Sequence, residues 1–522
     1  MGNKINLSFY KNNDIYIYDY LKRIDNKVLA LINSNPSILY RNFGFFYNET
    51  RKNLLESLDL SKDAEVLEVN ACLGAVTKFL CEKASSVTAI EFSLNNAKII
   101  ENRLKDKNNL EIIVGDLKDI KFNKKYDIIF ISELLEASNI FFDDKNSVDI
   151  FIDYFKNLLK EDGIIIFSIN NRYGIKNWCG SRDDYTGEQY DTLYNYPKRK
   201  TGFKAYSKPE LETIFSKKFN YVKFYYPTPD NYCNAQLLSD STIKLFEKKN
   251  LFTYNMVEKG HTFIDQAPLI GDLLDIGKFD FFANSFLIIV SDNMPKSELL
   301  YSKHLPSSCT RIVKNNDQIY AEKLPLDEEA KKIFNKTYDY YVSETNRLEK
   351  CNIKNIKLAR CIKKDNGTIA FDLAKGERFD ILVYEAIRQD NFSEFSKLLR
   401  GFKEMIYMLY PDRKVMDFTT QNMEKIFGVQ NIQNVECVKD ANFDMNFSNI
   451  FKDGDNYTLI DYDKVCPYYL PLDYIVYKGI RSVKSPYNLS ALNLFNEEND
   501  EIFRSMIISY YKCSEKDMYF DP

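Results

Sequence analysis

Residues 66–77 read Val66-Leu67-Glu68-Val69-Asn70-Ala71-Cys72-Leu73-Gly74-Ala75-Val76-Thr77, and this stretch decides the fold. It is a hydrophobic run that ends in a turn of small residues, and a helix is predicted to begin near Val76. In a parallel sheet, such a turn at the carboxyl end of a strand is where a nucleotide-like ligand is accepted. The stretch therefore predicts a Rossmann-like sheet with a cofactor at this turn.

The sequence on both sides of the turn fits the same architecture. Short apolar runs alternate with longer helical stretches from about residue 62 to 170, which is typical of an α/β sheet with helices on both faces. The predicted strands are 65–69, 87–91, 110–114, 126–131 and 163–169. A later apolar strand, 286–290, precedes a polar stretch, 291–296, which we interpret as a domain boundary.

The length of 522 residues favours more than one domain, because single hydrophobic cores rarely organise so long a chain. We predict an N-terminal helical extension over residues 1–45 and an α/β domain over 46–295. The remaining residues, 300–522, contain a hairpin-like stretch, a long charged helix near 327–350 and further strands and helices. They predict a separate α+β domain.

Composition excludes several classes of protein. The 71 basic and 75 acidic side chains are interspersed and give a net charge of −4, so no nucleic-acid partner is expected. No run of about 20 apolar residues is present, so no integral membrane segment is expected, and the start of the chain lacks a signal-peptide pattern. We expect a cytoplasmic protein. Ten cysteines without a CxxC pair and two histidines, His261 and His304, argue against a zinc framework and a histidine-based triad.

Polar residues follow the predicted strands at the edge where a cofactor would bind. Glu91 closes the second strand about 20 residues after Glu68, where such folds place a carboxylate on ribose hydroxyls. Asp116 ends the third strand, and Ser132 and Glu133 end the fourth.

This ordered set resembles the class I S-adenosylmethionine-dependent methyltransferase family over roughly residues 60–170. The resemblance implies that Glu68 and the backbone from Asn70 through Ala71 and Cys72 to Gly74 face the methionine end of S-adenosylmethionine. It implies that Glu91 holds the ribose and Asp116 reads the adenine amine, with Ser132 and Glu133 beside the cofactor. The family's E-x-G-x-G-x-G keeps only its last glycine here, and the Cys72 side chain is expected to crowd the cofactor. The alternative interpretation is a doubly wound domain without a cofactor.

The loop after the fifth strand is a candidate acceptor site. Segments 170–174, 179–187 and 194–197, together with 225–230 and 282–287, resemble methyltransferases among bacterial surface-polysaccharide and glycan-modification enzymes. Arg182, Asp183 and Asp184 lie where polar side chains reach a polyhydroxyl or phosphorylated acceptor. The alternative is a solvated loop. The sequence identifies no base for methyl transfer, since positioning can suffice for a nucleophilic amine.

A second constellation lies near the C-terminus. Asp444, Asn449 and Asp461 follow one another in the order that phosphoryl transfer needs: a carboxylate near the acceptor hydroxyl, then an amide and a carboxylate on Mg²⁺. Residues 305–480 resemble the kinase-like phosphotransferase fold in its small-molecule branch, which implies Lys323 as the ATP phosphate ligand. Glu344 is one candidate partner for Lys323, and a solvated face is the alternative for that side chain.

The departures from that fold family are also clear. Asn442 replaces the usual histidine, Tyr462 and Asp463 stand where Phe-Gly would in protein kinases, and no glycine-rich loop precedes Lys323. Protein-kinase activity is therefore not expected.

Together these features predict methyl transfer from S-adenosylmethionine to a bacterial surface glycan, its carrier or its phosphorylated substituent. A second activity with ATP and Mg²⁺, and glycosyltransferases of the same pathway as partners, fit this prediction. Two alternatives stay open. The C-terminal domain could be a non-catalytic module that binds glycan or a partner, or the whole chain could be an inactive scaffold.

Overall fold

The computed structural model describes residues 4–18, 21–22, 24, 29, 48–142, 145–196, 202–243, 263–316, 318–487, 489–492, 494 and 499–512. The chain divides into two compact units. The N-terminal unit comprises Met1–Leu305 and Cys309–Gln318, and the C-terminal unit comprises Pro306–Ser308 and Ile319–Pro522. Each unit has its own buried apolar core.

The N-terminal unit is built on one sheet with the strand order β1-β4-β3-β2-β5-β6-β9-β7-β8-β10-β11. Its strands are β1 (Ile5–Phe9), β2 (Glu65–Val69), β3 (Ser86–Glu91), β4 (Leu110–Gly115), β5 (Tyr126–Ser132), β6 (Leu159–Asn170), β7 (Tyr221–Thr228), β8 (Gln236–Ser239), β9 (Ser285–Ser291), β10 (Ser297–His304) and β11 (Ser308–Asn315). The pairs from β1 to β6 are parallel, and those from β6 onward are antiparallel. The carboxyl ends of β2, β3, β4 and β5 therefore meet at one edge.

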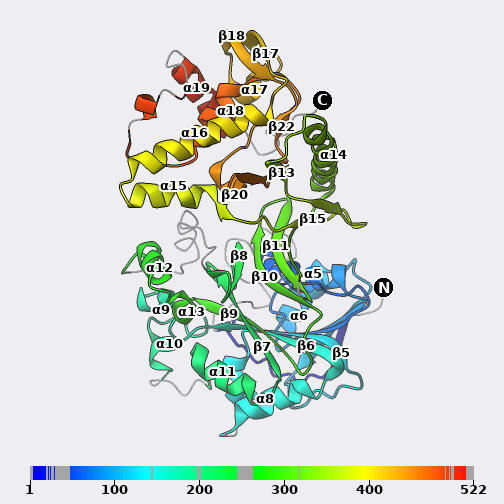
Figure 1. The fold of residues 1–522 in the computed structure, drawn as a ribbon. Helices are drawn as coiled ribbons and strands as arrows, with labels where there is room; N and C mark the ends of the chain where they lie inside the picture. Colours follow the sequence, from blue (N-terminus) through cyan, green and yellow to red (C-terminus); the bar gives the residue numbers. More distant parts are fainter. Residues whose placement is uncertain are drawn as a thin grey trace. The chain divides into compact units, whose positions relative to one another are not determined.

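Helices cover both faces of this sheet, with α5 and α6 on one face and α8 and α11 on the other (Figure 1). The helical elements are η2 (Glu49–Lys52), α4 (Asn53–Glu56), α5 (Thr77–Lys83), α6 (Leu94–Arg103), η3 (Leu135–Ala137), α7 (Ser138–Phe141), α8 (Ser147–Lys156), α9 (Ile175–Trp178), α10 (Asp191–Tyr194), α11 (Lys208–Ser216), α12 (Gln266–Asp275) and α13 (Phe279–Phe282). The strands β2 to β5 are buried apolar runs, as expected of a parallel sheet covered on both sides. The α/β class with a Rossmann-like sheet is confirmed.

The N-terminal extension differs from the helix that we expect for residues 1–45. Residues 5–9 form β1, which pairs in parallel with β4. The physical reason is their alternation of apolar and polar side chains, Ile5-Asn6-Leu7-Ser8-Phe9, which has the period of a strand rather than a helix. Most of residues 19–47 lie outside the described residues, as do His261 and Pro197.

The C-terminal unit mixes helices with small sheets. Its strands are β12 (Gln318–Pro325), β13 (Ile356–Leu358), β14 (Cys361–Lys363), β15 (Ile369–Asp372), β16 (Glu377–Arg378), β17 (Lys414–Thr419), β18 (Asn431–Val438), β19 (Ala441–Asn442), β20 (Ile450–Asp453), β21 (Asn456–Leu459), β22 (Val465–Cys466) and β23 (Leu470–Pro471). Its helical elements are α14 (Glu328–Lys350), α15 (Phe379–Arg388), α16 (Phe392–Leu409), α17 (Glu424–Phe427), η6 (Phe447–Asn449), α18 (Leu472–Arg481), η7 (Leu489–Leu492) and α19 (Asp500–Lys512). Asp327 caps α14 by accepting a hydrogen bond from the Ala330 N–H, and acidic residues fill the first turn of that helix.

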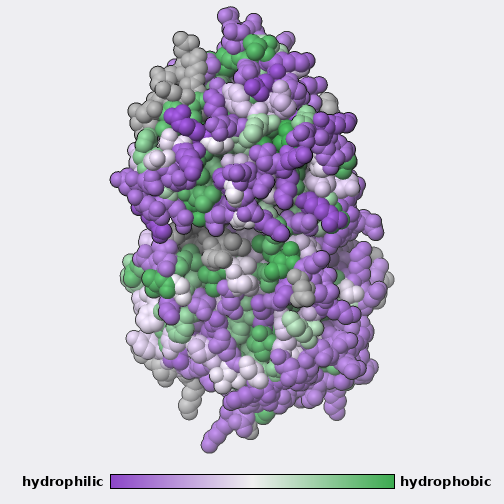
Figure 2. Space-filling view, viewed as in Figure 1, coloured by the Kyte–Doolittle hydropathy of each residue, from purple (hydrophilic) through white to green (hydrophobic). Residues whose placement is uncertain are grey.

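The surface of each unit that faces the viewer is mostly hydrophilic (Figure 2). Within the described ranges, no helix combines the length and the apolar character that crossing a membrane requires.

Candidate functional site

The turn after β2 holds three residues in a backbone conformation that glycine adopts most easily. Asn70, Cys72 and Gly74 have φ angles of 66°, 53° and 75°, all in the left-handed region. Asn tolerates this region, whereas Cys pays a conformational cost there. A Cβ at Gly74 would lie 3.3 Å from the Ile100 side chain. Both the positive φ and this close approach therefore favour glycine at this position. Two of the three left-handed positions of this turn are thus occupied by residues other than glycine.

The side chains of the turn are tied to the end of β5. The Asn70 amide donates to the Ser132 carbonyl at 2.7 Å, and the Cys72 thiol contacts Asn70 Oδ1 at 3.5 Å. Cys72 is buried and packs in the apolar core of the unit, and burial raises the pKa of its thiol. The Ala71 N–H donates to the carbonyl of Ile90 at 3.1 Å. The turn is therefore held by its two neighbouring strands.

Glu91 lies at the carboxyl end of β3 and faces this turn. Its carboxylate accepts hydrogen bonds from the Cys72 N–H (2.8 Å), the Ser93 N–H (3.3 Å) and the Asn96 side chain (2.9 Å). Burial raises the pKa of Glu91 to about 7, although these hydrogen bonds favour the charged form. Each carboxylate oxygen has more than one lone pair, so Glu91 can accept further hydrogen bonds from a diol such as a ribose.

Glu68 is a buried acid at the same edge. It is 1% exposed, and its Oε2 has no hydrogen-bond partner among the described residues. Burial raises the pKa of Glu68 to about 8. An unsatisfied buried oxygen costs free energy, and a ligand that donates to it would recover that cost. This orphaned atom fits the polar methionine end of S-adenosylmethionine.

Asp116 follows β4 at the surface. Its carboxylate accepts from the Lys118 N–H at 3.2 Å and pairs with Lys118 Nζ at 2.8 Å. The adenine contact implied by the resemblance stays a prediction.

Glu133, directly after β5, is the centre of a fully buried network. It pairs with Arg51 Nη2 at 2.7 Å, and both side chains are at most 3% exposed. The other donors to its carboxylate are Tyr18 (3.1 Å), Ser132 (2.8 Å), Ser168 (2.6 Å) and Asn231 (2.6 Å). A buried ion pair needs such additional hydrogen bonds to offset its desolvation. The sequence singles out Ser132 and Glu133 but misses Arg51, Ser168 and Asn231, which come from distant segments that carry no local signal.

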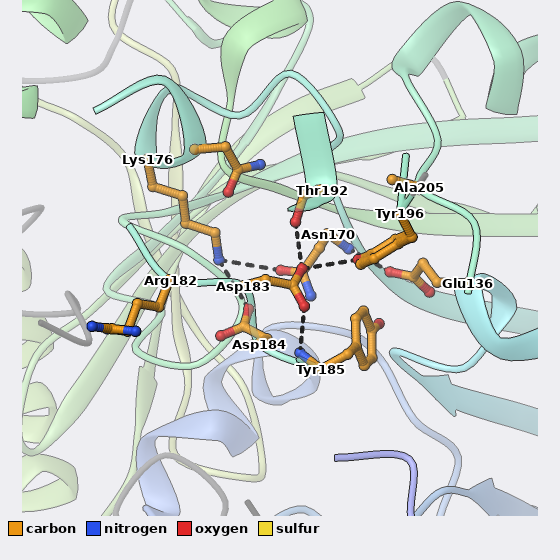
Figure 3. Close-up of a pocket in the computed structure, with 11 residues that line it drawn as sticks. Glu136, Asn170, Lys176, Arg182, Asp183, Asp184, Tyr185, Thr192, Tyr196 and Ala205 are labelled. Atoms are coloured by element: carbon orange, nitrogen blue, oxygen red, sulfur yellow. Dashed lines mark hydrogen bonds and ion pairs between the residues drawn. The ribbon is translucent and has the colours of Figure 1, made fainter. Parts of the chain in front are cut away.

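A small recess opens beside this network, at the carboxyl end of β6 (Figure 3). It is lined by Glu136, Asn170, Lys176, Asn177, Arg182, Asp183, Asp184, Tyr185, Thr192, Tyr196 and Ala205. The Tyr185 hydroxyl donates to the Glu133 carbonyl at 3.2 Å, which joins the recess to the Glu133 network. The candidate acceptor residues therefore lie in the same part of the unit as the end of β5.

The three candidate acceptor residues have different surroundings in the recess. Asp183 is buried, and its carboxylate accepts from the N–H groups of Tyr185 (2.9 Å) and Thr186 (2.7 Å) and from the hydroxyls of Thr186, Thr192 and Tyr196. Asp184 instead pairs with the largely buried Lys176 at 3.2 Å. Arg182 is exposed, donates to the Gly187 carbonyl at 3.0 Å and points away from the other labelled side chains (Figure 3). Asp183 thus has its acceptors occupied by the loop itself, and substrate contact stays a prediction for all three residues.

The C-terminal unit brings Lys323 together with two aspartates. Lys323 Nζ contacts Asp461 and lies 3.3 Å from Asp463. Burial alone would lower the pKa of Lys323, but the two carboxylates raise it well above its usual value. Glu344, the partner we consider for Lys323, pairs instead with Arg347 through two hydrogen bonds of 2.7 Å. The predicted pairing of Glu344 with Lys323 is therefore wrong. Side chains three residues apart on a helix are neighbours, so Arg347 is the partner within reach of Glu344.

The predicted phosphotransfer base, Asp444, lies in a neighbouring cluster of the same unit. It is paired with buried Lys478 and accepts from the Asn446 amide at 2.9 Å. Burial would raise the pKa of Asp444, but Lys478 and the more distant Lys464 lower it, so it is a carboxylate at neutral pH. The Asn449 amide nitrogen donates to the Asp444 carbonyl at 3.0 Å, and its Oδ1 accepts from the Ser448 hydroxyl at 3.5 Å. Within the part of the chain that the structure describes, no three Cys, His, Asp or Glu residues form a group that could hold a metal ion.

Comparison with known proteins agrees with the geometry of the N-terminal unit. The family profile described as "Methyltransferase domain" matches residues 67–167. The ribosomal RNA small subunit methyltransferase A of Mesomycoplasma hyopneumoniae is 40% identical over 78 residues, which are 15% of this chain and 29% of that protein. The protein of the same name from Malacoplasma penetrans is 26% identical over 110 residues, 20% of this chain and 40% of that protein. The chain thus spans less than half the length of these curated relatives.

Solved methyltransferase structures resemble this chain only distantly. An S-adenosylmethionine-dependent methyltransferase from Clostridium acetobutylicum shows 18% identity and a TM-score of 0.26, over 38% of this chain and 89% of that one. The N-methyltransferase NodS from Bradyrhizobium japonicum, solved with S-adenosyl-L-homocysteine, shows 20% identity and a TM-score of 0.27 over the same shares. The class therefore follows from the family match and the strand topology. Residues 67–167 form a class I S-adenosylmethionine-dependent methyltransferase domain.

Proposed function

We propose that this protein transfers a methyl group from S-adenosylmethionine to a glycan. The methyl-donor part of this proposal is supported by the turn after β2, in which Asn70, Cys72 and Gly74 are left-handed and the Cys72 N–H donates to the buried Glu91. Glu91 would accept from the ribose hydroxyls and Glu68 from the methionine end, while Asp116 would read the adenine amine. The donor supplies an electrophilic methyl carbon on a sulfonium. The chain's own residues bind and orient it and keep water away from the buried edge of the sheet.

A glycan acceptor is supported by aromatic side chains beside the recess. Tyr173 stacks between Trp178 and Phe281, with ring centroids 6.5 and 5.5 Å apart. Trp178 is 49% exposed and belongs to α9, the same short helix that contributes Lys176 and Asn177 to the recess. Aromatic faces that are open to solvent suit the apolar faces of sugar rings. The acceptor could equally be carried on a lipid or bear a phosphorylated substituent, and glycosyltransferases of a cytoplasmic pathway are the proposed partners.

The test is calorimetry of S-adenosylhomocysteine binding, followed by radiolabelled S-adenosylmethionine with a panel of glycan fragments. We expect one donor site per chain and transfer of label to sugar. A Trp178→Ala variant should lose affinity for the glycan and keep donor binding, whereas Tyr384→Ala, at an exposed aromatic of α15 in the C-terminal unit, serves as the control. Absence of donor binding would favour the inactive scaffold. Donor binding with label in RNA and not in sugar would contradict the glycan assignment.

For the C-terminal unit we propose ATP-dependent phosphotransfer as a second activity. The specific observation is that Lys323 contacts both Asp461 and Asp463, and that Asp444 and Asn449 are hydrogen-bonded to each other before the β20–β21 hairpin. Lys323 would bind a phosphate, Asp461 and Asn449 would offer oxygen ligands to Mg²⁺, and Asp444 would orient the acceptor hydroxyl. Binding of an ATP analogue, measured with and without Mg²⁺, tests this activity. No binding in either condition would favour a non-catalytic module that binds glycan or a partner.

A further inference from the structure

The recess beside the Glu133 network contains a buried acid that no role described so far uses. Glu136 lies in η3, directly after β5, and is 1% exposed. Its Oε1 accepts from the Asn170 N–H at 2.9 Å. Its Oε2 is buried and has no hydrogen-bond partner among the described residues. One half of the carboxyl group thus anchors η3 to β6, and the other half is left for a ligand.

The groups around Glu136 favour a ligand that donates hydrogen bonds and carries positive charge. Asp183 and Asp184 line the same recess, and Asp230, 1% exposed, lies 3.7 Å from Lys176 Nζ. Lys176 is engaged with Asp184 (3.2 Å) and with Asn170 Oδ1 (3.3 Å). Arg182, the other cation of the lining, is exposed and points away from these side chains. The acids that face the recess therefore outnumber the cations, which opposes entry of a phosphate and favours an ammonium group.

The recess is also connected to the donor turn. Asn70 of the donor turn bonds the Ser132 carbonyl, and Glu133 follows Ser132 at the end of β5. Tyr185, which lines the recess, donates to the Glu133 carbonyl. A continuous set of contacts therefore connects the donor turn to the recess through the end of β5.

We propose that Glu136 binds the amino group of the acceptor and removes its proton, so that the methylated atom is the nitrogen of an amino sugar. This inference rests on the proposed methyl transfer and narrows its acceptor. The ammonium first gives one proton to the Glu136 carboxylate. The nitrogen lone pair then forms a bond to the methyl carbon, while the carbon–sulfur bond breaks and its electron pair stays on sulfur. The products are a methylammonium group, neutral S-adenosylhomocysteine and a protonated Glu136, which releases its proton to solvent.

The protonation chemistry of Glu136 is suited to this step. Burial raises the pKa of Glu136 to about 8, and a base is most effective when its pKa lies near the working pH. Four titratable groups interact electrostatically with Glu136. They are Glu133 in its own segment and Tyr185, Tyr196 and Tyr206 from neighbouring segments. The rate at saturating acceptor should therefore rise from pH 6 to above 8.

The test compares the full-length parent with Glu136→Gln, which keeps an acceptor for the Asn170 N–H and cannot take the proton. Glu161→Gln, an exposed acid in β6, is the matched control. The acceptors are an oligosaccharide of β-linked glucosamine, its fully N-acetylated form and glucose 6-phosphate, each with radiolabelled S-adenosylmethionine. We expect label in the free-amine oligosaccharide at least tenfold faster than in the other two. Glu136→Gln should lose this rate at least 100-fold and its pH dependence, with unchanged S-adenosylhomocysteine binding and thermal midpoint.

The outcomes separate this inference from the proposed function. A parent that does not bind S-adenosylhomocysteine contradicts methyl transfer itself. A parent that binds it but labels the N-acetylated or phosphorylated sugar as fast, or leaves the free amine unlabelled, overturns the amine assignment. A Glu136→Gln variant that keeps the parent rate and pH profile overturns the role of Glu136 even if the amine is the acceptor.

Discussion

Buried acids have different partners in two regions of the molecule, the donor turn of the N-terminal unit and the lysine–aspartate clusters of the C-terminal unit. At the turn, Glu91 accepts only from neutral donors, and Glu68 keeps an oxygen without a partner in the described part of the chain. In the C-terminal unit, Lys323 contacts Asp461 and Asp463, and Lys478 contacts Asp444. The acids of the turn have raised pKa values, whereas the pKa of Asp444 is lowered.

The acids of the turn thus form no ion pair with the residues that the structure describes, whereas the acids of the C-terminal clusters are each paired with a lysine. A buried acid without a cation costs free energy that a hydrogen-bond donor in a ligand can offset. A buried ion pair is already compensated, and removing one partner leaves the other uncompensated. Ligand binding and pH should therefore act most strongly on the turn, and charge-removing substitutions on the C-terminal clusters.

The largest effect is expected for Asp461→Asn in the C-terminal unit. If this unit transfers phosphate, the substitution removes a charged Mg²⁺ ligand, and the rate should fall by at least about 100-fold because the reaction depends on electrostatic stabilisation and positioning. Methyl transfer should survive, since the two units have separate cores. Radiolabelled ATP and S-adenosylmethionine, given in parallel with the same glycan, measure both activities. Asp365→Asn, at an exposed turn, is the control.

Two results would break the comparison at this point. Loss of both labels in a variant that stays folded by circular dichroism would mean that the sites are coupled or share a substrate order. A parent that neither binds nor hydrolyses ATP would leave Asp461 as a structural partner of Lys323 and favour a binding module.

The next effect concerns Glu91→Ala at the donor turn. The substitution removes the acceptors for the ribose hydroxyls and also leaves the Cys72 N–H without its partner. We expect donor binding to weaken by about 1–3 kcal/mol, roughly 5- to 150-fold. Calorimetry with S-adenosylhomocysteine measures this, with Glu82→Ala on the exposed end of α5 as the control. Unchanged affinity would refute the ribose role.

The pH dependence of stability should differ in sign between Glu68 of the turn and Asp444 of the C-terminal unit. Burial raises the pKa of Glu68 to about 8, above its unfolded value near 4.5. The stability that this group contributes is therefore fully present below about pH 4.5 and is lost as the pH rises through about 8. The pKa of Asp444 is lowered, so its contribution is present at neutral pH and is lost as the pH falls through its folded value.

Glu68→Gln turns this contrast into a measurement. The amide stays neutral at every pH. Between pH 5 and 8, the free energy of unfolding should therefore fall by a few kcal/mol less in the variant than in the parent. Asp444→Asn should leave that interval unchanged and alter the acid limb. Urea unfolding from pH 8 down into the acid limb, followed separately for each unit, provides the data. Equal pH profiles for the parent and Glu68→Gln would show that Glu68 is not a buried neutral acid.

The sequence predicts the parallel sheet well, because its signals are local. Period and turn chemistry identify β2 to β6 and β9 close to their observed bounds. The same logic places Glu68, Glu91 and Asp116 at one edge, since carboxyl ends of parallel strands meet there. Strand β1 was missed although its alternation is visible, because so short a segment before the first core strand gives no hint of its pairing with β4.

Partners that come from distant segments could not be predicted in this way. Glu133 is visible as the end of a strand, but its pairing with Arg51 and Asn231 depends on how remote loops pack. Glu136 carries no motif at all, and only its burial and its unpartnered oxygen single it out. For Glu344 the sequence predicted a distant partner, Lys323, but the structure pairs it with Arg347 one turn away on the same helix.

The smallest effect is expected for Cys72→Gly, which tests whether the turn has adapted to its lost glycine. Cys72 has a φ of 53°, so glycine would relieve about 1 kcal/mol of conformational strain. The N–H that donates to Glu91 remains, and the loss is the buried thiol with its contact to Asn70. We therefore expect donor affinity at least equal to that of the parent and tighter by no more than about threefold, with a small change in stability because cavity and strain oppose each other. Cys81→Ala removes another buried thiol from a helical position and shows the cavity cost alone. Weaker donor binding by Cys72→Gly, measured by calorimetry with S-adenosylhomocysteine, would mean that the thiol supports the turn, so that Asn70 and Cys72 form a working replacement for two glycines and not a tolerated departure from them.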